Sequence, residues 1–109
     1  IPALAYRVQA GGRSVVFSTD QNGTNPAFAE FARGADALVM HLAVAVGDAN
    51  NPLHASPAVV GRVAKDAGVG RLILSHIGLF DLGPAVAEVK KYYTGPLTVG
   101  ADLQCIPVR

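Results

Sequence analysis

Short apolar runs separated by turn-forming residues predict a chain of alternating strands and helices. The runs 5–9 and 14–18 are expected to be two strands, because Gly11-Gly12 between them can supply the positive φ values of a tight hairpin turn. β-Branched and aromatic residues enrich the second run, as is typical of strands. The hairpin therefore begins the predicted sheet, and its second strand leads directly to the carboxylate of Asp20.

Three further segments carry the signals of helices. An Asn-Pro pair predicts a helix over 26–33 and a Ser-Pro pair predicts one over 57–67, because Asn and Ser cap helices and Pro suits the first helical position. Gly34 and Gly68 are expected to end these two helices. A third helix is predicted over 84–93. The residues expected to face inward are Phe28, Phe31 and Ala32, then Val59, Val60, Val63, Ala64 and Ala67, then Val86, Val89 and Tyr93.

Four more apolar runs complete the predicted sheet. The runs 36–42 and 71–75 are too short for buried helices and are expected to be buried strands, while 97–99 and 104–108 are expected to close the chain as short strands. The predicted order is β-β-α-β-α-β-α-β-β, which is that of an α/β domain with a mixed sheet. The chain has 109 residues and no interior linker, so we expect one domain over 1–109.

Composition suggests an apolar surface that a partner covers. The chain is 50% hydrophobic and only 16% charged, which is apolar for a small domain. Its net charge is +1, so no basic excess points to nucleic acid. Lys90-Lys91 beside Tyr92-Tyr93 is the only basic and aromatic cluster, and a solvated helix face explains it more simply. We therefore do not expect nucleic acid as a partner, whereas a homo-oligomer stays open.

The single cysteine and the chain start add little about location. Cys105 excludes an intrachain disulfide and is expected to be a small buried side chain. No apolar run approaches the roughly 18 residues of a membrane helix. The chain opens on Ile1-Pro2 without an initiator Met or a signal peptide, so we expect it to come from a longer chain. The compartment is open, with the cytoplasm favoured.

Two residues at predicted strand ends are candidate metal ligands. Asp20 and His76 both follow strands directly, and loops at the carboxyl ends of strands converge in α/β sheets. A carboxylate and an imidazole are ordinary ligands for zinc or another borderline divalent metal. Two ligands are fewer than the three or so that a catalytic zinc takes, so the rest would come from elsewhere. The alternative is that Asp20 is a turn residue and His76 a structural histidine.

His54 is the candidate for catalysis. It precedes the Ser-Pro helix start, where its structural role would be loop packing and its active role would be donating a proton or a hydrogen bond to an oxyanion. The third histidine, His41, carries only the structural interpretation. No Gly-x-Ser-x-Gly elbow occurs, and Gly11-Gly12 joins two strands rather than opening a helix, so it is not a phosphate loop.

Taken together, the segments resemble metallo-β-lactamase-fold hydrolases. Residues 5–20 are similar to the strand pair that ends in the metal-bridging Asp of that family, and 28–41 to the helix and strand that follow. His54-Ala-Ser-Pro followed by 63–76 is similar to the "His-x-Ser/Thr, helix, strand, His" segment of the ribonuclease Z and arylsulfatase-like branch, and 93–102 to the closing strand. The resemblance covers nearly the whole chain in order.

The resemblance implies a place in a larger fold. The family has a four-layered αβ/βα sandwich of two similar halves, and this chain would be the C-terminal half, a mixed sheet with helices on one face. Asp20 would bridge two metal ions, usually zinc, and His76 would be the last ligand of the second site. His54 would match the substrate-facing histidine of the branch.

Three departures from the family pattern limit what the resemblance implies. The family's His-x-His-x-Asp-His signature is absent from this chain. Thr19 stands where a Gly usually precedes the bridging Asp. Leu42 stands where ribonuclease Z relatives carry a Glu after the His that matches His41, which argues against tRNA processing and leaves the substrate open.

We weigh three functional hypotheses. The first is part of a zinc-dependent hydrolase of ester, sulfate-ester, phosphodiester or lactone bonds in small-molecule substrates, active only with the missing N-terminal half or a companion chain. The second is a non-catalytic half-domain whose sheet face serves dimerisation or partner binding. The third is an α/β binding module unrelated to metal, in which Asp20 and His76 point apart.

Overall fold

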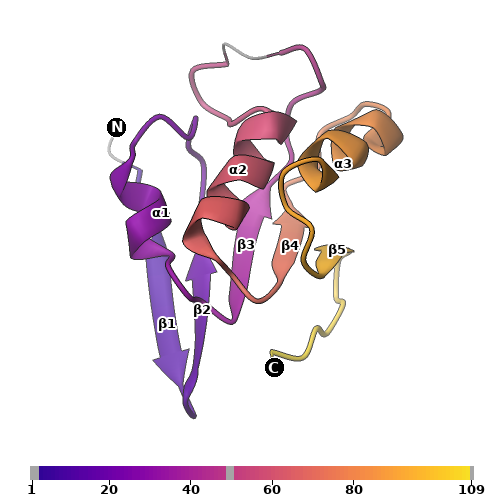
Figure 1. Ribbon diagram of the computed structural model, residues 1–109. Coiled ribbons are helices and arrows are strands. Elements are labelled where there is room, and N and C mark those ends of the chain that lie inside the picture. Colours follow the sequence, from indigo (N-terminus) through magenta and orange to yellow (C-terminus); the bar gives the residue numbers. More distant parts are fainter. Residues whose placement is uncertain (1–2, 49–50, 109) are drawn as a thin grey trace.

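Five strands, taken in chain order, form one mixed sheet. The computed structural model describes residues 3–48 and 51–108. The hairpin strands β1 and β2 are antiparallel, and β3, β4 and β5 continue the sheet in parallel. Helices α1, α2 and α3 cover one face of this sheet (Figure 1). The elements are β1 (Tyr6–Ala10), β2 (Arg13–Phe17), α1 (Ala27–Phe31), β3 (Ala37–His41), α2 (Pro57–Ala67), β4 (Leu72–Ser75), α3 (Leu82–Lys90) and β5 (Leu97–Val99).

Local sequence signals explain the hairpin and α2. Gly11 and Gly12 have φ values of 56° and 74°, as a two-residue hairpin turn with two positive φ angles requires. Ser56 caps α2 by accepting a hydrogen bond from the Val59 amide at 3.4 Å. Gly68 ends the helix in the left-handed conformation, with φ 63°. The predicted bounds of α2 are therefore confirmed.

The core lies between the sheet and the helices. Because side chains alternate along a strand, one face of β2, β3 and β4 supplies fully buried aliphatic residues that pack on α2 and α3. Each such side chain contributes about 1.5–3 kcal/mol to folding. The main members are Val16, Leu38, Met40, Leu72 and Leu74 from the sheet, and Val60, Ala64 and Val89 from the helices.

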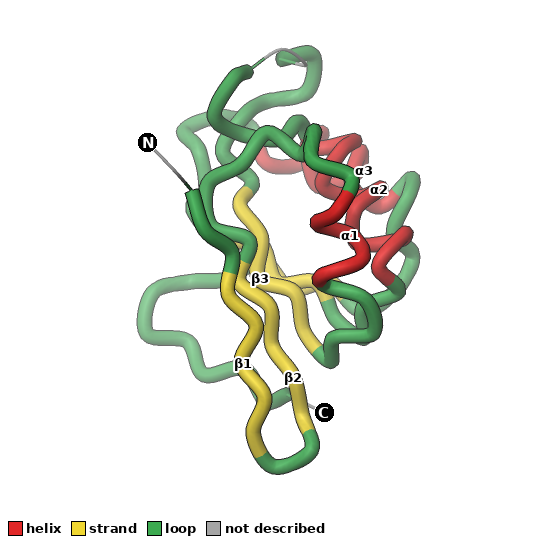
Figure 2. The backbone as a smooth tube through the Cα atoms, turned by 90° about the vertical axis from the view of Figure 1, so that its left-hand side faces the viewer, coloured by secondary structure: helices red, strands yellow, loops and turns green. Residues whose placement is uncertain are grey.

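None of the helices in the described residues lies on the opposite face of the sheet (Figure 2). On the hairpin this face presents Tyr6, Val8 and Phe17, which stay exposed although they are large and apolar. Tyr6 and Phe17 are paired in the β1–β2 register, so they lie side by side on the same face. We call this surface, defined by Tyr6, Val8 and Phe17, the open sheet face. It is the apolar surface that the composition suggests.

Two helix predictions need correction. The first helix spans only Ala27–Phe31 instead of 26–33, and its N-cap position is held by Pro26 without a side-chain hydrogen bond, so the prediction that Asn25 caps it is wrong. Phe31, predicted to face inward, is 42% exposed at the end of the helix. The third helix begins at Leu82 rather than Pro84, because the Asp81 carboxylate accepts a hydrogen bond from the Gly83 amide at 3.1 Å and caps the helix two residues earlier. It ends at Lys90 rather than Tyr93.

The end of the chain also differs from the prediction. Within the described residues, 104–108 form no strand. The Gln104 amide donates to the Ala101 carbonyl at 3.1 Å, and Leu103 has a φ of 63°, so the backbone turns away from the sheet after β5. Cys105 is consequently exposed, and the prediction that it is buried is wrong. No helix among the described residues has the length and apolar character to cross a bilayer.

Candidate metal centre

Asp20 projects from the carboxyl end of β2. The Ser18 amide still donates to the Val39 carbonyl of β3, at 2.9 Å, so the backbone remains in the sheet up to that point. Thr19 then adopts a φ of 53° and its hydroxyl donates to the Leu4 carbonyl. This left-handed residue turns the chain, and the exposed Asp20 carboxylate leaves the sheet immediately after it.

His76 leaves β4 in the same way. β4 ends at Ser75, whose carbonyl accepts from the Leu42 amide at 2.9 Å, and His76 follows with a φ of 48°. The Gly78 amide then returns to the Leu42 carbonyl at 3.0 Å and holds the loop. Non-glycine residues rarely adopt this conformation, so backbone strain is concentrated beside Asp20 and at His76.

Three candidate side chains converge at this edge of the sheet. The Asp20 Oδ1 atom lies 3.4 Å from His54 Nε2 and 4.0 Å from His76 Nε2. The His54 and His76 rings stack with centroids 5.1 Å apart. One potential ligand atom from each residue falls within 4.8 Å of the others. The hypothesis that the Asp20 and His76 side chains point apart therefore fails.

The donor set fits a divalent metal. One carboxylate oxygen and two imidazole nitrogens are typical zinc ligands. His54 Nε2 is buried and has no hydrogen-bond partner among the described residues, as expected of a nitrogen facing a site for a cation. Ligands on one tetrahedral zinc lie about 3.3 Å apart, so the Asp20–His54 spacing matches, while His76 would have to move closer or bind a second ion.

His41 lies beside the cluster of Asp20, His54 and His76, although the sequence suggested only a structural role for it. It is 2% exposed at the end of β3, and its Nε2 lies 2.9 Å from the Gln21 carbonyl. A carbonyl only accepts, so Nε2 carries the proton and Nδ1 does not. The ring meets His54 edge-on at 5.1 Å. Burial lowers the pKa of His41, which favours a neutral ring that holds Gln21, and with it Asp20, in place.

Thr19 offers a direct test of the strain beside Asp20. We expect Thr19→Gly to be more stable than Thr19→Ala by about 1 kcal/mol, because both lose the hydroxyl bond to Leu4 and only glycine relieves a positive φ. This explains why a Gly is the usual residue there in the family that the sequence resembles. Urea denaturation of both variants measures the difference.

Thr24 provides the matched control, since it does not have a positive φ. There the order should reverse, with Thr24→Ala more stable than Thr24→Gly, because glycine costs more backbone entropy. If Thr19→Ala proved as stable as Thr19→Gly, the strain assigned to this turn would be absent.

Comparison with known proteins gives matches over most of the chain. The family model described as the β-lactamase superfamily domain matches residues 2–77. A probable metallo-hydrolase, YhfI of Bacillus subtilis, is 28% identical over 101 residues, which cover 91% of this chain and 41% of that protein. A ribonuclease Z of Methanosarcina mazei is 34% identical over 105 residues, covering 89% of this chain and 33% of that protein.

Solved structures agree with these matches. The crystal structure of YhfI, described as a metallo-β-lactamase-fold protein, superimposes with a TM-score of 0.81 over 88% of this chain and 40% of its own. The short form of human tRNase Z reaches 0.76 over the whole chain at 19% identity, which supports the fold alone. The chain spans about a third to two fifths of the length of these relatives.

Proposed function

Because this chain belongs to the β-lactamase superfamily domain family, a family of metallo-β-lactamase-fold hydrolases, we propose that it is part of a zinc-dependent hydrolase. The bond cleaved would be an ester, sulfate ester, phosphodiester or lactone of a small-molecule substrate. The observation that carries the proposal is the convergence of the Asp20, His54 and His76 side chains at one edge of the sheet.

Asp20 and His76 are the proposed metal ligands. Asp20 follows Thr19, which has a positive φ, and His76 has a positive φ itself. These two turns direct the Asp20 and His76 side chains off the sheet and toward each other. A divalent metal bound here would polarise the scissile bond and activate water as the nucleophile. The task of the two side chains is to hold that ion at a fixed distance from His54.

His54 is the proposed catalytic residue. Its ring is held between the edge of His41 and the face of His76, which restricts its orientation. Its Nε2 faces the Asp20 carboxylate at 3.4 Å and has no other partner among the described residues. From this position it would donate a hydrogen bond or a proton to the charge that develops as the bond breaks.

The remaining ligands would come from outside this chain. We propose that residues 1–109 form the C-terminal half of the domain and that an N-terminal half, or a companion chain, completes the site. Support comes from the share of the relatives that the chain spans, about a third to two fifths. The open sheet face would be the surface that this other half covers, because its exposed Tyr6, Val8 and Phe17 are costly to leave in water.

The same face also supports the second hypothesis. A non-catalytic half-domain would use Tyr6, Val8 and Phe17 for dimerisation or for binding a partner. The two functions differ in metal content, because only the hydrolase needs the Asp20 and His76 side chains to hold an ion.

The test combines the intact mass, zinc content and hydrolysis of a nitrophenyl phosphodiester by the longest form of the protein that its gene encodes. We expect a mass above 11.2 kDa, bound zinc, and turnover that a chelator abolishes. His54→Ala should retain the zinc and lose at least about 100-fold in turnover, the scale of general acid–base catalysis. Loss of zinc in this variant would make His54 a ligand instead. A mass near 11.2 kDa without zinc would support the half-domain.

A further inference from the structure

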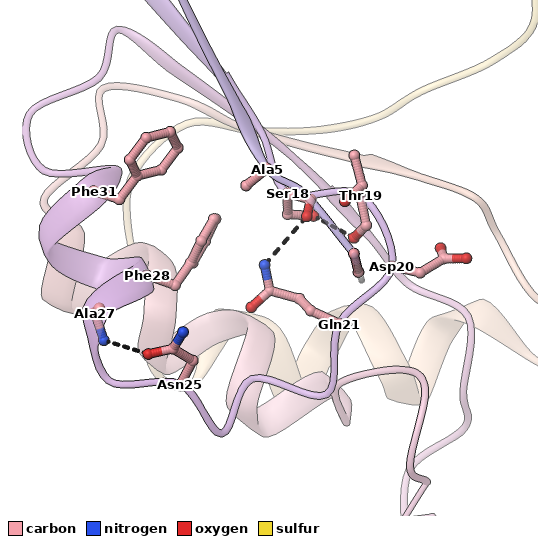
Figure 3. A pocket seen from close by; sticks show the side chains of 10 residues that line it. Ala5, Ser18, Thr19, Asp20, Gln21, Asn25, Ala27, Phe28 and Phe31 are labelled. Carbon is pink, nitrogen blue, oxygen red and sulfur yellow. Dashed lines mark hydrogen bonds between the residues drawn. The ribbon is translucent and has the colours of Figure 1, made fainter. Parts of the chain in front are cut away.

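A second concavity lies behind the segment that carries Asp20. It has a volume of about 380 Å³ and lies between this segment, the chain leading into β1, and helix α1. We call it the α1 pocket and define it by Ala5, Gln21, Asn25, Phe28 and Phe31. Figure 3 shows these side chains gathered on one side of the segment, while the Asp20 carboxylate points away from them.

The α1 pocket is separate from the candidate metal centre. A smaller recess of about 190 Å³, lined by His41 and His76, lies on the metal side, and both cavities share Ser18, Thr19 and Asp20 as a wall. A ligand in the α1 pocket would therefore contact the backbone that positions Asp20 without entering the metal site. The size falls in the range of small-ligand sites, about 300–1,000 Å³.

Two aromatic rings border the α1 pocket. The rings of Phe28 and Phe31 are tilted by 40° with centroids 6.3 Å apart. Phe28 belongs to the core, but Phe31 stays 42% exposed beside the pocket. A half-exposed phenylalanine next to a cavity is a ready surface for a flat apolar ring, because stacking would remove its remaining area from water.

The polar atoms of the pocket are fixed in orientation. Gln21 Nε2 donates to the Ser18 carbonyl at 3.2 Å, and Asn25 Oδ1 accepts from the Ala27 amide at 3.0 Å. These bonds determine which end of each amide is which. Gln21 Oε1 and Asn25 Nδ2 are the two ends left over, and no hydrogen bond joins either to another residue lining the pocket (Figure 3).

We propose that the α1 pocket binds a nucleobase. It pairs aromatic rings with one hydrogen-bond acceptor, Gln21 Oε1, and one donor, Asn25 Nδ2. Every base has a flat face for stacking and a Watson–Crick edge on which a donor adjoins an acceptor. A plain aliphatic group would fill the volume but leave both amide ends unpaired. Recognition through a ring face and edge needs no basic excess, so it is compatible with the net charge of +1.

The first arm of the test asks whether a base is bound. Cytidine, guanosine, a four-nucleotide RNA and an abasic strand of equal length are titrated into the longest natural form of the protein, in EDTA, with NMR or calorimetric detection. We expect saturable binding of the base-containing probes and none of the abasic strand. Equal affinity for nucleoside and RNA identifies a free nucleoside as the source, and tighter RNA binding identifies a base within a strand. Absence of saturable binding by every probe overturns the proposal.

The second arm changes the pocket while preserving the fold. Asn25→Asp keeps the oxygen that accepts from the Ala27 amide at the start of α1 but replaces the Nδ2 donor with an acceptor. Cytidine should then bind about five- to 100-fold more weakly, while guanosine, which presents two adjacent donors, should be spared. An equal change for the two nucleosides would overturn the proposal.

The third arm removes the stacking surface. Phe31→Ala should weaken every base-containing probe by about five- to 100-fold, because base–aromatic stacking is lost. Phe17→Ala is the matched control, since Phe17 is 40% exposed but lies on the open sheet face. The proposal fails if the two variants bind alike. Because all arms are run without metal and without turnover, they do not depend on the hydrolase proposal.

Discussion

Asp20→Ala is expected to lower the zinc affinity of the protein by at least about 100-fold, because changes in the shell behind a ligand already cost 10–100-fold. Asp20 is the only carboxylate in the group of three candidate ligands that the described residues bring together. Its Oδ1 faces both His54 Nε2 and His76 Nε2, so its removal takes away the one carboxylate in this cluster that would attract a cation.

Two measurements read this effect. Competition with a chromophoric chelator gives the zinc affinity directly. Thermal unfolding gives it indirectly, because a ligand that binds only the folded state raises the melting temperature as its concentration increases. The unsubstituted protein should show this rise and the Asp20→Ala variant should not. Both experiments need the longest natural form of the protein, in which the proposed remaining ligands are present.

Asp66→Ala is the matched control for lost charge. Asp66 is an exposed carboxylate on α2 and is not a member of the candidate cluster. Its removal changes the net charge by the same amount and should leave zinc binding unaltered. Equal zinc affinities in the Asp20→Ala and Asp66→Ala variants would remove Asp20 from the site.

The closeness of Asp20 and His76 could be predicted because it depends on local signals and one general rule. Each residue follows a run of apolar and β-branched residues that predicts a strand, and the carboxyl ends of parallel strands meet at one edge of a sheet. Their 4.0 Å separation depends in addition on the order of the sheet, because β3 lies between β2 and β4 and the turns of positive φ must carry both side chains over its end.

The contribution of His41 could not be predicted in the same way. Its position opposite Ser75 depends on the register of β3 against β4, which no local signal specifies. The contact between His41 and His54 is a further tertiary contact between residues that are 13 positions apart in the sequence, and no local signal specifies it. Phe31 was wrongly predicted to be buried. Helical spacing predicts burial only if the helix continues, and α1 ends at this residue.

Gly61→Val is expected to destabilise the fold by at least about 1–3 kcal/mol, the usual cost of overpacking. Gly61 is buried in α2, and a Cβ there would lie 2.5 Å from the Val89 carbonyl oxygen and 3.1 Å from the Tyr92 Cβ. The closest atom belongs to the backbone of α3, so it cannot rotate away, and the two helices must separate. A loss of this size is a large part of the 5–15 kcal/mol that holds a typical domain together.

The sign of this effect separates packing from helix propensity. At a helix position with free space, replacing Gly with Ala would stabilise the fold by about 0.8–1 kcal/mol. We expect Gly61→Ala to destabilise the fold instead, because the contact with Val89 outweighs this gain in helix propensity. Lys65→Val is the matched control, because Lys65 is exposed on the same helix and Val there carries only its propensity cost. Urea denaturation of the three variants gives the order of their free energies of unfolding: Lys65→Val near the unsubstituted protein, Gly61→Ala lower, and Gly61→Val lowest.

If Gly61→Val were as stable as Lys65→Val, α2 and α3 would not be in close contact at Gly61. The position also bears on the candidate metal centre, because α2 begins three residues after His54 and a displaced helix would move that side chain away from Asp20.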